Sequence, residues 1–81
     1  MFYVYLIQSI NFPREHYVGF SEDLKTRIKD HNVGKSTHTN KFRPWKLIVY
    51  FAFKDILTAK DFENYLKTGS GRAFLKKHFL K

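Results

Sequence analysis

The chain has 81 residues and no cysteine, and its 15 Lys and Arg outnumber seven Asp and Glu for a formal net charge of +8. The length predicts one domain over residues 1–81, and the missing cysteines exclude disulfides, thiolate zinc sites and thiol nucleophiles. The basic excess favours a polyanionic partner such as nucleic acid. The sequence has neither a long apolar run nor a signal-peptide pattern, so a cytoplasmic protein without membrane association is expected.

The N-terminal part of the chain predicts a β-hairpin. FYVYLIQ (2–8) is apolar on both faces, which is typical of a central strand that is covered on both sides. INFPREH (10–16) contains turn-forming residues and reads as a loop. Because this connection is short, it favours antiparallel pairing with a second strand, YVGF (17–20).

A helix and a polar loop follow the hairpin. Ser21 fits a helix N-cap, and the helix continues through LKTRIKDHN (24–32). Gly34 marks its end, as glycine does where a helix stops. Residues 34–43, GKSTHTNKFR, are small, polar and basic, so they predict a loop.

The remaining chain predicts a third strand and two more helices. WKLIVYFAF (45–53) is a long β-rich run that is again apolar on both faces. Thr58 can cap the next helix, with Asp61 at the capping-box distance. Gly69-Ser70-Gly71 would end that helix and cap a third, RAFLKKHFL (72–80). The order β-β-α-β-α-α predicts an α+β fold.

The tyrosines of the first two strands raise the question of why phenols stand where Phe or Val would fill the same space. If Tyr5 lies opposite Gly19, then Ile7 lies opposite Tyr17 and both phenols project from one face of the sheet. Gly19 would then leave a vacancy beside Tyr5 where a ligand approaches the sheet. A shift of one residue in the strand register would place the two phenols on opposite faces. The competing interpretation is that both tyrosines belong to the core and that their hydroxyls are simply hydrogen-bonded.

Helix spacing adds an arginine, a histidine and a carboxylate to this face. The apolar Leu24 and Ile28 must face the sheet from the first helix. Arg27 and His31 share their face by i, i+3 and i+4 spacing, so the guanidinium is drawn toward the core, where it needs a partner. Glu63 borders the buried stripe of the second helix. One interpretation is an Arg27–Glu63 ion pair or two solvated rim residues, and the other is a catalytic site.

Two phenols, one arginine, one histidine and one carboxylate suit the hydrolysis of a phosphodiester. The carboxylate can hold a divalent metal while waters and phosphate fill the other positions. The arginine can grip the phosphate, and a phenol or imidazole can orient or deprotonate the attacking water. A free phenol has a pKa of about 10, so a tyrosine acts as a base only where a metal or cation lowers that pKa.

This ordered set resembles the GIY-YIG endonuclease superfamily over nearly the whole chain. YVY (3–5) stands in the place of Gly-Ile-Tyr, with tyrosine where the family has glycine, and YVG (17–19) stands in the place of Tyr-Ile-Gly. Arg27 matches the arginine of the following helix, and Glu63 matches the metal-binding glutamate of a later helix. The stretches most like the small, single-domain bacterial members are HNVGKSTHT (31–39) and ENYLKTGSGRAFLKKH (63–78).

The resemblance implies a three-stranded antiparallel sheet flanked by helices and Mg²⁺- or Mn²⁺-dependent hydrolysis of DNA strands. It places Tyr5 and Tyr17 in the catalytic site. It also places Arg27 on the phosphate and Glu63 on the metal. In some members a histidine joins the catalytic set, and His31 stands near that position. The sequence does not rank Tyr5, Tyr17 and His31 as the general base.

The basic residues predict how DNA is held. Phosphate contacts carry no sequence information, so weak sequence preference and steep salt dependence are expected, and a partner protein would have to supply targeting. Phe42 and Trp45 could stack bases, although Trp45 at the start of an apolar strand is more typical of a core. The candidate DNA contacts are Lys35, Lys41, Arg43, Lys67, Arg72, Lys76 and Lys77.

The alternative function is a nucleic-acid-binding module that keeps the nuclease fold but has little activity. The sequence favours the nuclease, because a module that only binds has no reason to retain Glu63. A carboxylate repels phosphate unless a metal ion lies between them.

Overall fold

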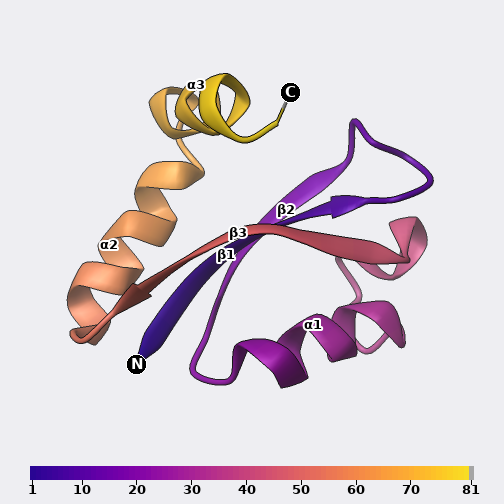
Figure 1. Cartoon of the computed structure of the whole chain (residues 1–81), viewed down its shortest axis with the longest axis horizontal. Coiled ribbons are helices and arrows are strands. Elements are labelled where there is room, and N and C mark those ends of the chain that lie inside the picture. Colours follow the sequence, from indigo (N-terminus) through magenta and orange to yellow (C-terminus); the bar gives the residue numbers. More distant parts are fainter. Residues whose placement is uncertain (81) are drawn as a thin grey trace.

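The computed structural model describes residues 1–80, and Lys81, the last residue of the expected domain, lies outside them. Over residues 1–80 the expected α+β fold and its order β-β-α-β-α-α are confirmed (Figure 1). One antiparallel sheet has the strand order β2-β1-β3. Its elements are β1 (Phe2–Ser9), β2 (His16–Ser21), α1 (Leu24–Asn32), the short 3-10 helix η1 (Asn40–Phe42), β3 (Trp45–Phe53), α2 (Ile56–Leu66) and α3 (Gly69–His78).

Strand β1 is the central strand, as its apolar sequence predicts. Alternate side chains of a strand point to opposite faces, so Val4 and Leu6 project to the face covered by α2 and α3. There they join a cluster with Ala59, Leu66 and Leu75, each of them almost fully buried. This cluster is the larger core of the molecule.

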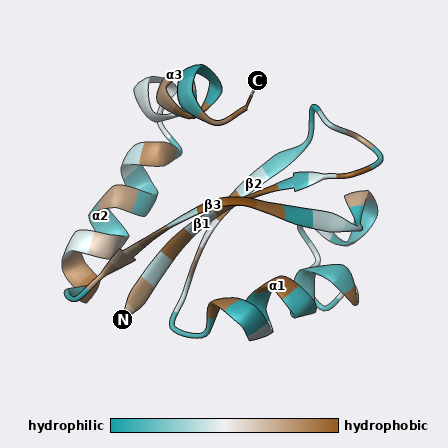
Figure 2. Cartoon of the chain, in the orientation of Figure 1, coloured by the Kyte–Doolittle hydropathy of each residue, from teal (hydrophilic) through white to brown (hydrophobic). Residues whose placement is uncertain are grey.

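The opposite face of the sheet carries a second, smaller core beneath α1. Tyr5 and Ile7 of β1 form it with Trp45 of β3, and Leu24 and Ile28 of α1 pack against it. Helix α1 therefore turns the expected residues toward the sheet. Figure 2 shows hydrophobic residues concentrated in the strands and hydrophilic ones along much of α1, which agrees with a helix covered on one side only. Among residues 1–80 no helix has both the length and the apolar character needed to cross a bilayer.

The first two helices begin at aspartates rather than at the hydroxyl residues that the sequence suggested. Asp23 caps α1 by accepting from the backbone N–H of Thr26 at 3.1 Å, so the expectation of Ser21 as the cap is wrong. Asp and Ser cap helices about equally well, and Ser21 is already used as the last residue of β2. Asp55 caps α2 in the same way, at 2.8 Å from the N–H of Thr58.

Helix α3 begins earlier than its sequence suggested. Its N-cap is Thr68, and residues 69–71 form its first turn instead of ending α2. Gly71 is buried against α2, where an added Cβ would overlap the backbone oxygen of Tyr65. The glycine is therefore needed for close packing between α2 and α3. The stop at Gly34 is confirmed, since this residue has a φ of +84° just after α1.

Candidate functional site

The strand register brings the two phenols to one face. Tyr5 pairs with Gly19 and Ile7 pairs with Tyr17, as expected. Tyr5 is 1% exposed, whereas Tyr17 is only partly buried. The expectation of a vacancy for a ligand at Gly19 is wrong, because a Cβ there would overlap the Tyr5 hydroxyl. Gly19 makes room for the Tyr5 ring itself.

The Tyr5 hydroxyl begins a buried chain of hydrogen bonds. It lies 2.7 Å from Nε2 of His31, and Nδ1 of His31 lies 2.6 Å from the hydroxyl of Thr39. The indole N–H of Trp45 donates to the backbone oxygen of Thr39 at 2.8 Å, which ties the polar loop to the core. His31 is fully buried, so it is placed to position Tyr5 rather than to meet solvent. Thr39 was not singled out from the sequence, since a threonine in a polar loop carries no distinguishing pattern.

Burial sets the protonation of this chain. Removal from water lowers the pKa of His31 to about 4. The positive charge of Arg27 also lowers this pKa, whereas the negative charge of Asp30 opposes the shift. Burial also raises the pKa of Tyr5 to about 12, although Arg27 opposes that rise. Both groups are therefore neutral at pH 7. A neutral imidazole has one N–H and one acceptor nitrogen, so it donates to one neighbour and accepts from the other.

The buried neutral imidazole makes stability depend on pH. As pH falls below 6.5, His31 takes up a proton in the unfolded chain first, and the folded protein follows only near pH 4. We expect this residue to lower the free energy of unfolding by about 3 kcal/mol between pH 6.5 and pH 4, at 1.36 kcal/mol per pKa unit. Urea unfolding across this range, compared with His31→Gln, measures the difference, and an NMR titration of the His31 ring checks its pKa. If the free energy of unfolding fell equally with pH in wild type and His31→Gln, the expected role of His31 would be contradicted.

Arg27 and Glu63 approach the same phenols from different elements. Hydrogen bonding to the Tyr5 hydroxyl raises the pKa of Arg27, which places the guanidinium beside the buried chain. The Glu63 side chain is 13% exposed and lies 3.0 Å from Nζ of Lys67 and 3.8 Å from Nζ of Lys60. The Arg27–Glu63 ion pair that the sequence left open is not among the ion pairs of residues 1–80.

Two observations place Glu63 near the phenols. Its negative charge contributes to the raised pKa of Tyr5. The ammonium of Lys67, which it binds, lies 6.0 Å from the centre of the Tyr17 ring. The ammonium group of Lys67 thus lies close to both Glu63 and Tyr17.

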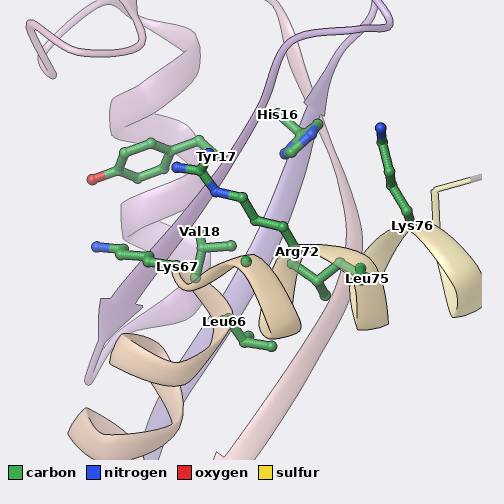
Figure 3. A pocket seen from close by; sticks show the side chains of 10 residues that line it. His16, Tyr17, Val18, Leu66, Lys67, Arg72, Leu75 and Lys76 are labelled. Carbon is green, nitrogen blue, oxygen red and sulfur yellow. The ribbon is translucent and has the colours of Figure 1, made fainter.

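An open groove of about 710 Å³ runs beside Tyr17 between β2 and α3 (Figure 3). Its floor is apolar, and its cationic side chains are Lys67, Arg72 and Lys76. Figure 3 shows Arg72 extending from α3 toward Tyr17, with Lys76 further along. Burial, with the charges of Arg72 and Lys76, lowers the pKa of His16, which lines the same groove.

The seven basic residues expected to contact DNA are all exposed but divide into two groups. Four of them belong to the C-terminal helices or their junction, and three of those four line the groove. The other three belong to η1 or to the segments on either side of it. In the loop before η1, Nζ of Lys35 lies 3.6 Å from Oδ1 of Asp30. The first group is Lys67, Arg72, Lys76 and Lys77, and the second is Lys35, Lys41 and Arg43.

The residues present fit a magnesium-type ion only through Glu63. Among residues 1–80 no group of three His, Cys, Asp or Glu side chains comes together. Mg²⁺ commonly keeps several waters and is held by one or two carboxylates plus substrate phosphates, so a single carboxylate close to a basic groove suits it. A zinc site built from protein ligands does not fit the described residues.

Comparison with known sequences identifies the family. Residues 1–77 match the GIY-YIG catalytic domain. The chain belongs to the GIY-YIG family. The match extends from the first strand through most of α3, so both tyrosine motifs, Arg27 and Glu63 lie inside the GIY-YIG nuclease domain. The resemblance seen in the sequence is confirmed.

Two similar proteins come from yeasts and share one name. "Structure-specific endonuclease subunit SLX1" of Candida dubliniensis is 38% identical over 71 residues, covering 79% of this chain and 25% of the relative. The protein of the same name from Scheffersomyces stipitis is 37% identical over 68 residues, covering 75% of this chain and 20% of the relative. This chain thus spans a fifth to a quarter of the length of these relatives.

A solved structure has a similar fold. A UPF0213 protein of Bacillus halodurans, determined by NMR in solution, matches with a TM-score of 0.56 and 27% sequence identity. The match covers 95% of this chain and 84% of that one. A small bacterial protein therefore shares the fold over nearly its whole length.

Proposed function

We propose that this chain is a metal-dependent endonuclease that hydrolyses phosphodiester bonds in DNA, with residues 1–81 as one nuclease domain. The observation that carries this proposal is the meeting of the Tyr5–His31 chain, Arg27 and Glu63 beside a basic groove. These groups come from one strand and two helices, namely β1, α1 and α2. We take the edge of the sheet at β2, where the groove lies, as the catalytic edge. GIY-YIG nucleases are typically metal-dependent, which agrees with a carboxylate at this edge.

Glu63 is the residue that would hold the metal ion, and Lys60 and Lys67 would then turn from its carboxylate toward DNA phosphates. The bound ion would neutralise charge on the scissile phosphate and make a water a better nucleophile. Arg27 supplies a second positive charge, and its fork of N–H donors suits a phosphate oxygen. Together these groups would balance the charge that develops on the phosphate in the transition state.

Tyr17 is the phenol that we assign to the attacking water. It is only partly buried and lines the groove, so its hydroxyl can meet a water beside a bound phosphate. Tyr5 would have to give its proton to His31 in order to act as a base. With pKa values of about 12 and about 4, that transfer is steeply uphill in the free protein. We therefore assign Tyr5 and His31 to positioning Arg27 and the phosphate.

The DNA would be held mainly through its phosphates. The net charge of +8 and the groove cations Lys67, Arg72 and Lys76 support binding with weak sequence preference. The named relatives are endonuclease subunits of much greater length. In this proposal, a partner protein or a further segment directs the nuclease domain to its target.

A plasmid-nicking assay with Mg²⁺ or Mn²⁺, run beside Glu63→Gln, tests the function. We expect wild-type protein to nick supercoiled DNA only with a divalent ion, and Glu63→Gln to lose this activity while melting normally, because an amide binds metal less well than a carboxylate. Asp61→Asn is the matched control, since Asp61 is an exposed carboxylate on the same helix, and it should nick like wild type. Tight DNA binding without nicking in either ion would support the binding-module alternative instead.

A further inference from the structure

The groove beside Tyr17 continues toward the β1–β2 loop through two further hollows. The first groove shares His16 and Lys76 with a second hollow, which Gln8 also lines. The second hollow shares Pro13 and Arg14 with a third. Because each hollow shares two lining residues with the next, we treat the three hollows together as one track. Its cations, in order from the catalytic edge, are Lys67, Arg72, Lys76 and Arg14.

The far end of this track is a pair of aromatic rings, of which Phe12 is exposed and Phe42 is partly buried. Phe12 is 51% exposed, and its ring lies 5.4 Å from that of Phe42 at an angle of 72°. The ammonium of Lys41 lies 5.7 Å from the centre of the Phe42 ring. Phe12 and Phe42 line the third hollow together with Arg14 and one carboxylate, Glu15. Trp45, the other aromatic residue considered for stacking, is 4% exposed and belongs to the core.

Hydrogen bonds hold this aromatic pair in place. The buried Ser9 hydroxyl donates to the backbone oxygen of Phe42 at 2.6 Å and accepts from the N–H of Phe12 at 3.0 Å. The N–H of Glu15 donates to the backbone oxygen of Phe12 at 2.8 Å, and the Gln8 amide donates to that of Pro13 at 2.7 Å. The loop therefore presents an apolar ring to water in a fixed position. A ring held in this way loses little entropy when a ligand stacks on it.

We propose that Phe12 and Phe42 form a stacking platform for an unpaired nucleobase of DNA, and that the basic track carries the backbone from the catalytic edge to that base. An aromatic face beside cations matches a base with its attached phosphates, and stacking is tolerant of sequence because every base has a π-face. The platform rests on the nuclease function proposed above. It adds a substrate preference, for duplex DNA that continues into a single strand.

Binding measured without metal tests the platform separately from the chemistry. Fluorescence anisotropy in EDTA would compare a blunt duplex with the same duplex carrying a single-stranded tail of about five nucleotides, a length within the usual range for single-strand sites. We expect wild-type protein to prefer the tailed DNA. Phe12→Ala should lose about tenfold in affinity for the tailed DNA and little for the blunt duplex. Phe12→Trp should retain the preference.

Two further variants sharpen the comparison. Leu57→Ala removes another exposed apolar side chain, on α2, which is 70% exposed, and should leave both affinities unchanged. Arg14→Ala should lower the salt slope for tailed DNA by about one. An unchanged preference in Phe12→Ala, or an equal loss for both DNAs, would overturn the platform. Failure of Phe12→Trp to retain the preference would do the same, whether or not the protein cleaves DNA.

Discussion

Arg27→Ala should lower the single-turnover rate of DNA cleavage by about 100- to 1,000-fold, the usual effect of removing one preorganised group that stabilises transition-state charge. Arg27 lies beside the Tyr5 hydroxyl, where it can face the scissile phosphate. DNA binding should remain largely intact because many other cations share the general attraction to DNA. Quenched-flow or gel assays at saturating protein measure the rate, and anisotropy measures the affinity.

Arg72→Ala provides the matched comparison for Arg27. Arg72 lines the groove from α3, away from the Tyr5–His31 chain, so its loss should weaken binding and lower the salt slope by about one. Cleavage of fully bound DNA should proceed nearly as in wild type. Arg27→Lys keeps the charge but not the planar fork, and an intermediate rate is expected. An Arg27→Ala protein that cleaves at the wild-type rate would return this residue to a structural role.

The fold was predictable where local pattern and packing agree. A strand that is apolar on both faces has to lie at the centre of a covered sheet, and β1 does. The short β1–β2 loop allows only a hairpin, and the pairing of Tyr5 with Gly19 then follows from one choice of register. The turn of α1 toward the sheet was equally well determined, because Leu24 and Ile28 must be buried.

The parts that the sequence did not predict depend on contacts between distant segments. Ser21 and Asp23 are equivalent as caps until the end of β2 is known, and Gly19 alone does not indicate which side chain fills its place. Thr39 gains its role only when the polar loop folds back onto His31. The aromatic end of the track likewise requires Phe12 and Phe42, 30 positions apart, to meet through Ser9.

Tyr17→Phe and Tyr5→Phe should affect the protein in different ways. Each substitution keeps the ring and deletes the hydroxyl, so chemistry is separated from packing. Tyr17→Phe should lower cleavage by about 100-fold or more, as expected for loss of a water-orienting or general-base group, and should melt almost normally because Tyr17 is only partly buried. Tyr5→Phe removes the partner of the buried His31 Nε2, which should lower the free energy of unfolding by about 1–3 kcal/mol.

Cleavage by Tyr5→Phe then distinguishes a positioning role from a catalytic one. A positioning role predicts a modest loss of cleavage rate, because the Arg27 side chain would no longer be held in place by the Tyr5 hydroxyl. It also predicts a raised pKa of His31 in an NMR titration, since water would reach the imidazole. If Tyr17→Phe stays fully active while Tyr5→Phe is inactive, the water-activating phenol is Tyr5, and its proton must then pass to His31 despite their separated pKa values. Full activity in both variants would mean that YVY (3–5) and YVG (17–19) serve packing alone, because no phenol would then be needed at either position. Arg27 and Glu63 would in that case have to activate the water through a metal ion without help from the sheet.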